Sequence, residues 1–267
     1  MTSATKRPAG ADMAFDAVPE PRSIPFDEPW QWLASGWRDM LRVPHISLTY
    51  GAVFTLAAAA LVVGLWIIEI RSIFFALAGG FLLIGPLLAV DLYEASRRLG
   101  RGETVRFADV MGAGLRARGQ LAFFGAALLF AFFLWLQLAL LLLMLFVGTS
   151  GLPPPDEIIQ LVLFTPRVLG MVVVGTLVGG VIAVSIFAIS VVSVPMLLVS
   201  RVDAASAARA SLAAVVKNPK PLVLWAALIV AIVALGFAML LVGLVIAIPL
   251  IGHATWHAYA AIYGTPD

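Results

Sequence analysis

The chain has 267 residues, of which 62% are hydrophobic and only 12% charged, and its formal net charge is +2. That much apolar surface exceeds what a soluble core of this size can bury, so the composition predicts an integral membrane protein. The absence of cysteine excludes disulfides, thiolate nucleophiles, thiolate metal sites and iron–sulfur clusters.

The first segment, residues 1–28, is rich in Ala, Pro, Asp and Glu. It lacks the continuous apolar run of a cleaved signal peptide, so we expect a disordered cytoplasmic tail. The rest of the chain, residues 29–264, is expected to form one transmembrane helical domain.

Apolar stretches of about 20 residues, enough to cross a bilayer, lie at 46–68, 73–92, 120–147 and 168–200. The first two are separated only by Glu69–Ser72, which predicts a tight helical hairpin. A fifth apolar block, 221–262, carries no charge and is too long for one ordinary span. We expect two shorter spans there, 221–239 and 242–262, with Gly236 and Gly243 near the turn. Five spans with an external C-terminus is the alternative.

The basic residues are distributed unevenly around these spans. All of the Lys and Arg residues except Arg71 and Arg167 fall before the first span, between the second and third, or between the fourth and fifth. The positive-inside rule therefore predicts a cytoplasmic N-terminus. Six spans return the C-terminus to the cytoplasm.

Three parts of the chain share one pattern. An amphipathic helix precedes the first, third and fifth spans, and its last turn carries Arg42, Arg116 or Lys217. A proline recurs in the second span of each pair, at Pro86, Pro195 and Pro249. The sequence thus predicts an all-α polytopic transmembrane helix bundle of six spans, built from three amphipathic-helix-plus-hairpin repeats at about 29–100, 101–200 and 201–264.

Amphipathic helices at the membrane surface carry aromatic and basic residues that hold the adjoining spans at the headgroup level. Six residues have the type and position for this role: Trp30, Trp37, Arg42, Arg116, Lys217 and Trp256. Membrane lipids are therefore the first partners that we expect.

Small residues four apart allow helices in a membrane to pack closely. The stretch GTLVGGVIA places Gly175, Gly179 and Ala183 on one helix face, where the partner is another helix of the same chain or a second copy. Outside the membrane, residues 148–167 form a loop that we interpret as a packing element, with a substrate gate as the alternative.

Two of the three histidines, His253 and His257, stand four apart on the last span, and His45 is predicted at the same membrane face. This spacing puts both rings on one helix face, where they could bind a metal or haem. A structural zinc site needs further ligands, however, and no HExxH motif is present. We therefore expect no metal and no cofactor, and interpret the histidines as interfacial or helix-capping residues.

Four blocks resemble one bacterial membrane family, domain of unknown function 2189. They are DEPWQWLASGWRDMLRVPHISLTYGAVF, GGFLLIGPLLAVDLYEASRRL, LFTPRVLGMVVVGTLVGGVIAVSIFAISVVSVPMLL and IPLIGHATWHAY, within residues 25–262. The resemblance implies a helical membrane topology in the bacterial inner membrane and transfers no catalytic residue. Some members are labelled similar to cytochrome c oxidase subunit I, but that subunit needs more histidines than this chain has.

These observations favour a non-enzymatic multi-pass inner-membrane protein that acts through packing or by binding another membrane protein or a second copy. The first alternative is a carrier or channel for an uncharged or lipid-like solute, suggested by the repeated hairpins and the prolines. A haem- or metal-binding membrane protein is the second. Nucleic-acid binding is not expected, because the basic residues are spread over membrane-adjacent loops.

Overall fold

A computed structural model describes residues 17–68, 74–116, 119–148 and 165–264. These residues form helices and connecting turns, without a strand. Six helical segments in them are long and apolar enough to cross a membrane: Pro44–Ile67, Ala76–Gly100, Gly119–Val147, Pro166–Val199, Pro219–Ala238 and Leu244–Tyr263. The predicted all-α bundle with six membrane-length helices is confirmed. The chain turns between residues 238 and 244, so the single long helix of the five-span alternative is not found.

The helices follow one order three times. The first unit contains α1 (Glu28–Arg42), α2 (Pro44–Ile67), α3 (Phe74–Leu88) and α4 (Val90–Gly100). The second contains α5 (Phe107–Val110), α6 (Ala113–Arg116), α7 (Gly119–Val147), α9 (Pro166–Ser190) and α10 (Ser193–Val199). The third contains α11 (Ala204–Lys217), α12 (Pro219–Ala238) and α13 (Leu244–Tyr263). Each unit thus begins with a surface helix segment and continues with two long apolar helices.

The second unit differs from the predicted pattern, because its amphipathic helix is interrupted. The chain leaves the helical conformation after Val110, and Gly112 has a φ of +72°, which ends α5 before α6 begins. The Asp91 carboxylate accepts the backbone N–H groups of Gly112 and Ala113 at 3.3 and 2.9 Å. A carboxylate on α4 therefore holds this break in place.

The three prolines lie in second helices but bend them differently. Pro86 lies near the end of α3, after which the helix breaks at Ala89 and resumes as α4. Pro195 follows the break at Val191 and Val192 and lies inside α10. Pro249 lies within α13, which stays continuous. The three prolines therefore differ in position along the second helix as well as in the break beside them: Pro195 lies near the end of the apolar segment, whereas Pro249 lies in the first third of α13.

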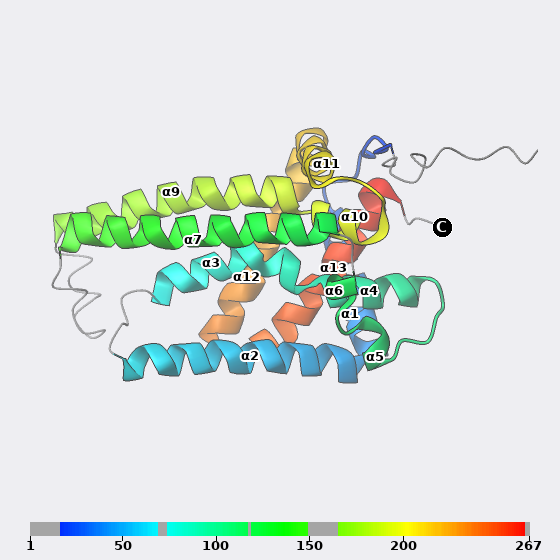
Figure 1. The fold of residues 1–267 in the computed structure, drawn as a ribbon, viewed down its shortest axis with the longest axis horizontal. Helices are drawn as coiled ribbons and strands as arrows, with labels where there is room; N and C mark the ends of the chain where they lie inside the picture. The colour runs from blue at the N-terminus through cyan, green and yellow to red at the C-terminus, as the bar shows by residue number, and fades with distance from the viewer. Residues whose placement is uncertain (1–16, 69–73, 117–118, 149–164, 265–267) are drawn as a thin grey trace, which may run out of the picture.

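Three layers are visible in the ribbon (Figure 1). The helices α2, α7 and α9 run along the long axis of the molecule, with α2 on one side and α3, α7 and α9 on the other. The α12–α13 hairpin crosses obliquely between them, and α13 packs against α1, α2, α4 and α12. The last helix in the sequence is therefore the central helix of the fold.

Close backbone approach holds α13 in this central position. A Cβ added to Gly36 of α1 would lie 2.6 Å from the backbone nitrogen of Ala254, and one added to Gly51 of α2 would collide with the carbonyl oxygen of Val245. Because Pro249 has no N–H, that carbonyl has no partner four residues along in α13. Glycine in α2 and proline in α13 thus allow the two helices to approach at the same point.

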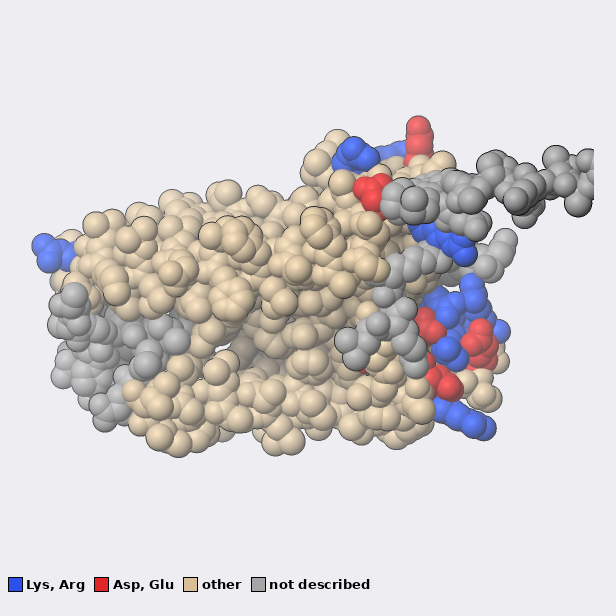
Figure 2. Space-filling model, viewed as in Figure 1, with Lys and Arg blue, Asp and Glu red and all other residues tan. Residues whose placement is uncertain are grey.

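Charged side chains gather at one end of the molecule, where α1, α4, α11 and the end of α13 meet (Figures 1 and 2). The long flanks formed by the apolar helices are almost free of them in this view. Arg167, at the start of α9, lies at the opposite end of that helix from the charged cluster. The charged residues that are unevenly distributed along the sequence are therefore also concentrated at one end of the folded protein.

Residues 17–27 correct the prediction of a disordered tail extending to residue 28. The N–H of Arg22 donates to the carbonyl of Ile262 (2.9 Å), and Asn218 bonds the backbone of both Ile24 and Arg22 at 2.9 Å. The segment therefore runs along α11 and α13 as an ordered strap. Its low hydrophobicity suggested disorder, but backbone hydrogen bonds to a distant asparagine hold it. Residues 1–16 lie outside the described residues.

Asn218→Ala is expected to release this strap. Loss of the side chain leaves the Ile24 N–H and the Arg22 carbonyl without their partners, at a cost of about 1–3 kcal/mol. Limited proteolysis of the purified protein should then cleave within residues 17–27 faster than in the wild type. The matched control is Lys217→Ala, an exposed neighbour on α11, which should leave the cleavage rate unchanged. Equal rates in Asn218→Ala and the control would contradict the strap.

Candidate functional site: a buried histidine network

His253 lies at the centre of a polar network within the charged half of the bundle. Its side chain is 0% exposed, and both ring nitrogens are bonded: Nε2 to the Ser47 hydroxyl at 2.9 Å and Nδ1 to the Ser96 hydroxyl at 2.8 Å. Ser47 comes from α2 and Ser96 from α4, so one imidazole on α13 joins three helices. Buried polar groups in lipid must be satisfied inside the protein, and this geometry does so.

The Asp39 carboxylate lies close to this network. The Ser96 hydroxyl helps to lower the pKa of the Asp39 carboxyl, and a carboxylate only accepts hydrogen bonds. A Ser96 proton directed at Asp39 leaves Ser96 to accept from the Nδ1–H of His253, with Ser47 donating to Nε2. We infer this tautomer from the donors and acceptors available.

Asp39 extends the network to a second histidine. The Nε2 of His257 lies 2.8 Å from Asp39 Oδ2, and Asp39 is only 4% exposed. Burial alone would raise the pKa of the Asp39 carboxyl, but hydrogen bonds from His257 and Ser96, with the charge of His257, outweigh it and hold that pKa below its usual value. The carboxylate stays ionised and ties α1 to α13.

The lowered pKa of Asp39 makes the stability of the folded protein depend on pH. Because the folded-state pKa of Asp39 is lowered, its contribution to stability is present above the unfolded pKa of about 4 and is lost as the pH falls through the folded value. Asp39→Asn should lower the melting temperature at pH 6 and flatten its decline below about pH 4. The control is Asp27→Asn, an exposed carboxylate before α1, which should keep the wild-type profile. An unchanged profile in Asp39→Asn would contradict this role.

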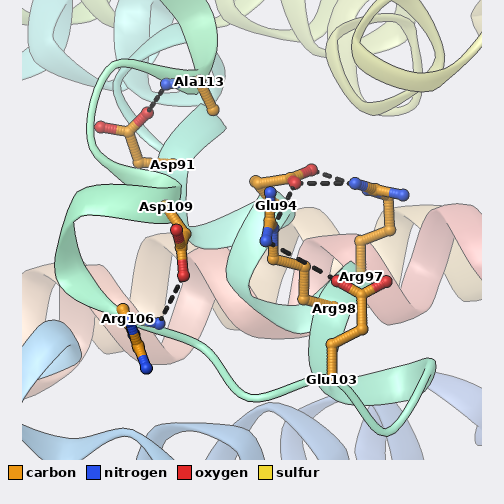
Figure 3. A network of polar contacts seen from close by, with 8 residues as sticks. All are labelled: Asp91, Glu94, Arg97, Arg98, Glu103, Arg106, Asp109 and Ala113. Carbon is orange, nitrogen blue, oxygen red and sulfur yellow. Dashed lines mark hydrogen bonds and ion pairs between the residues drawn. The ribbon is translucent and has the colours of Figure 1, made fainter.

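A second polar cluster lies on α4 and the turn after it (Figure 3). Both oxygens of the buried Glu94 carboxylate bond Arg97 at 2.7 Å, and Arg98 Nε lies 2.7 Å from one of them. Arg98 also lies 3.7 Å from Glu103. Next to this group, the Asp109 carboxylate accepts the backbone N–H of Arg106 at 3.2 Å. The cluster neutralises charge on α4 and fixes the connection to α5.

The structure separates the predicted interfacial residues into two groups. Trp30, Trp37, Arg42 and Lys217 are exposed at the surface helices α1 and α11. Trp256 is only 2% exposed and packs against Tyr259 with ring centroids 5.4 Å apart, so its prediction as an interfacial anchor is wrong. It faces the core because α13 is surrounded by other helices. The side chain of Arg116 lies outside what the structure describes.

The predicted packing face on α9 is only partly used. Gly179 lies against Trp135 of α7, where an added Cβ would come within 2.8 Å of the indole. Gly175 has open space instead, and Ala183 is exposed. Among the described residues, α7 therefore meets this face of α9 at one of its three small residues, and the partner of the other two stays a prediction. The predicted loop 148–167 falls almost entirely outside the described residues.

The three histidines do not converge on one point. His45 is exposed on α2, whereas His253 uses both ring nitrogens on serines and His257 bonds Asp39. In the described ranges no group of three or more His, Asp or Glu is placed to hold a metal ion. This arrangement can hold helices together and can exchange protons along its hydrogen bonds.

Sequence reasoning found the two histidines but missed Ser47, Ser96 and Asp39. The serines lie singly in or beside apolar runs, and Asp39 reads as part of the polar face of an amphipathic helix. The single available signal was the position of Gly36, three residues before Asp39, because a glycine within a helix often marks a close approach. It does not identify the helix that approaches.

Fold and network together define a multi-pass α-helical integral membrane protein. Residues 73–199 match the family model described as "Predicted integral membrane protein (DUF2189)". The resemblance found in the sequence is thereby confirmed for the segment from the end of the first hairpin turn to the end of α10. No curated protein and no solved structure matches the chain. Among the network residues, only Ser96 lies in the matched segment.

Proposed function

We propose that this protein acts in the bacterial inner membrane without catalysis of its own, by binding another membrane protein or a second copy. Its buried polar groups support a structural use: Asp39, Glu94 and His253 each bond side chains that hold helices or turns together. The positive-inside rule supports cytoplasmic termini, because the basic cluster adjoins both ends of the described chain. A reporter fused after residue 267 would report the side of the C-terminus.

The observation that carries the proposal is the open face of α9. Val172, 40% exposed, lies there one helical turn before Gly175 and on the same side of the helix as Ala183, and no helix among the described residues covers these two small residues. Lipid supplies little drive for helix association, so close contact of small residues is the usual basis of docking in membranes. A helix from a partner or a second copy fits this face.

Photo-cross-linking in cells tests that proposal. A photoreactive residue at Val172 should give a discrete protein adduct, and Gly175→Ile should abolish it by filling the contact. The same residue at Leu61, exposed on α2, serves as the control and should give lipid adducts alone. Lipid adducts alone at Val172 would contradict the proposal.

A second candidate is a carrier for a lipid-like or uncharged solute. Its support is the separation of α2, which packs mainly on α13, from the layer of α3, α7 and α9, where Figure 2 shows the surface hollowed toward the end away from the charges. Flux of fluorescent lipids in proteoliposomes tests it. A rate equal to that of protein-free vesicles would count against it.

A further inference from the structure

The third hairpin reaches less deeply along the molecule than the other long helices. Val245, the second residue of α13, lies against Gly51, early in α2, and His253 bonds Ser47. Eight residues of α13 thus pass four residues of α2, so α13 crosses α2 obliquely. In Figure 1 the α12–α13 turn lies beside the middle of α2, far from the end that α2, α7 and α9 approach.

Helix geometry gives a bound on this depth. From Gly51 to Ile67, α2 continues for roughly 24 Å at about 1.5 Å per residue. Leu240 lies five residues before Val245, and the hydrogen bonds of the turn keep that segment within roughly 10 Å. The tip of the hairpin therefore stops more than about 10 Å short of the end of α2.

The composition of the turn agrees with a position away from water. The other two hairpin connections carry charged residues, Glu69 and Arg71 in one and Asp156 and Glu157 in the other. The α12–α13 connection is Met-Leu-Leu-Val-Gly, residues 239–243, without a polar side chain. Leu240 is 87% exposed, and Met239 and Val242 are also exposed. These large apolar side chains would face water if the hairpin crossed the membrane.

Part of the backbone of the turn is hydrogen-bonded internally, as an apolar surrounding favours. The N–H of Val242 donates to Met239 at 3.1 Å, and that of Leu244 donates to Leu241 at 2.9 Å. The Met239 N–H donates to Leu235 at 3.0 Å. Close packing of Gly243 on Gly236, where an added Cβ would lie 2.9 Å from Cα, lets the hairpin close tightly. These internal hydrogen bonds replace part of those that water would supply.

We propose that α12 and α13 form a re-entrant hairpin, which enters from the charged end and turns inside the hydrocarbon, where lipid acyl chains cover Met239, Leu240 and Val242. The polypeptide then crosses the membrane completely four times, and its C-terminus stays on the same side as its N-terminus. The tip is a surface for acyl chains, set between α2 and the layer of α3, α7 and α9. Four crossings are compatible with either candidate function above.

Single cysteines in the full-length protein test this directly, because the natural chain has none. Leu240→Cys and Val242→Cys are compared with Thr104→Cys at the charged end and Arg167→Cys at the opposite end, in vesicles of both orientations. A membrane-impermeant maleimide should label each control from one side. We expect both tip cysteines to react at least roughly tenfold more slowly than either control from either side, since thiols in hydrocarbon are shielded from water. In detergent both should react fully with a small membrane-permeant maleimide, because no part of the described protein covers their side chains.

Labelling of the tip cysteines from the side that labels Arg167→Cys would overturn the proposal, since it places the turn at the opposite aqueous face. Labelling from the side that labels Thr104→Cys would overturn it equally, because the hairpin would then lie outside the membrane. Loss of reactivity in detergent would show that the tip is covered by protein and not by lipid. Each variant should elute like the wild type in gel filtration, which shows that it is folded. If Leu240→Cys fails this check, Val242→Cys tests the tip in its place.

Discussion

Gly51→Ala should destabilise the protein by about 2–3 kcal/mol although it adds only one methyl group. The added Cβ would collide with the Val245 carbonyl, which is backbone and cannot rotate away. Helix α2 would have to move off α13, and the hydrogen bond from Ser47 to His253 would lengthen with it. Thermal unfolding in detergent, followed by tryptophan fluorescence, measures the effect.

Gly64→Ala is the matched control, because it makes the same change in the same helix. An added Cβ at Gly64 meets nothing within 4 Å. Because alanine loses less conformational entropy than glycine when a helix forms, Gly64→Ala should leave the free energy of unfolding unchanged or raise it by about 0.5–1 kcal/mol. Equal melting temperatures for the two variants would show that α2 and α13 do not touch at Gly51.

His253→Ala should cost about 3–5 kcal/mol, the largest effect expected from any histidine in the chain. It opens a cavity among α2, α4 and α13 and leaves the Ser47 hydroxyl without its partner in a fully buried position. Ser96 loses the hydrogen bond of its hydroxyl to the ring as well. The melting temperature in nanodiscs is the measurement.

Two further variants separate this network from the alternatives. His45→Ala removes an exposed imidazole and should change stability by less than about 0.5 kcal/mol. His253→Gln keeps hydrogen-bonding groups in the cavity and should recover part of the loss. If His253→Ala were as stable as His45→Ala, the imidazole would not fasten these helices.

The long helices could be predicted from the sequence because the length of an apolar stretch and its lack of charged residues determine them. Residues 221–262 show this: an uncharged block too long for one helix turns close to Gly236 and Gly243, as expected. The buried face of α13 was not predictable in the same way. Apolar residues surround His253 on all sides of that helix, so no periodicity identifies the inward face. Trp256 was accordingly assigned to the interface when it lies in the core.

Contacts between residues far apart in the sequence could not be predicted either. Asp39 and His257 are 218 positions apart, and the strap of residues 17–27 depends on Asn218. Nothing local at Asp39 distinguishes a solvated carboxylate on an amphipathic helix from one buried against another helix. The interruption at Gly112 likewise depends on Asp91, which the chain brings back from the preceding unit.

Helix α13 is the central helix to which polar contacts attach α1, α2 and α4. A double-mutant cycle of Asp39→Asn and His257→Gln directly measures the interaction free energy between these two side chains, one on α1 and one on α13. We expect the two changes to be non-additive, with a coupling of about 1–3 kcal/mol in the free energy of unfolding at pH 7. Additive effects would mean that the carboxylate and the imidazole do not meet, and would contradict the arrangement of α1 on α13.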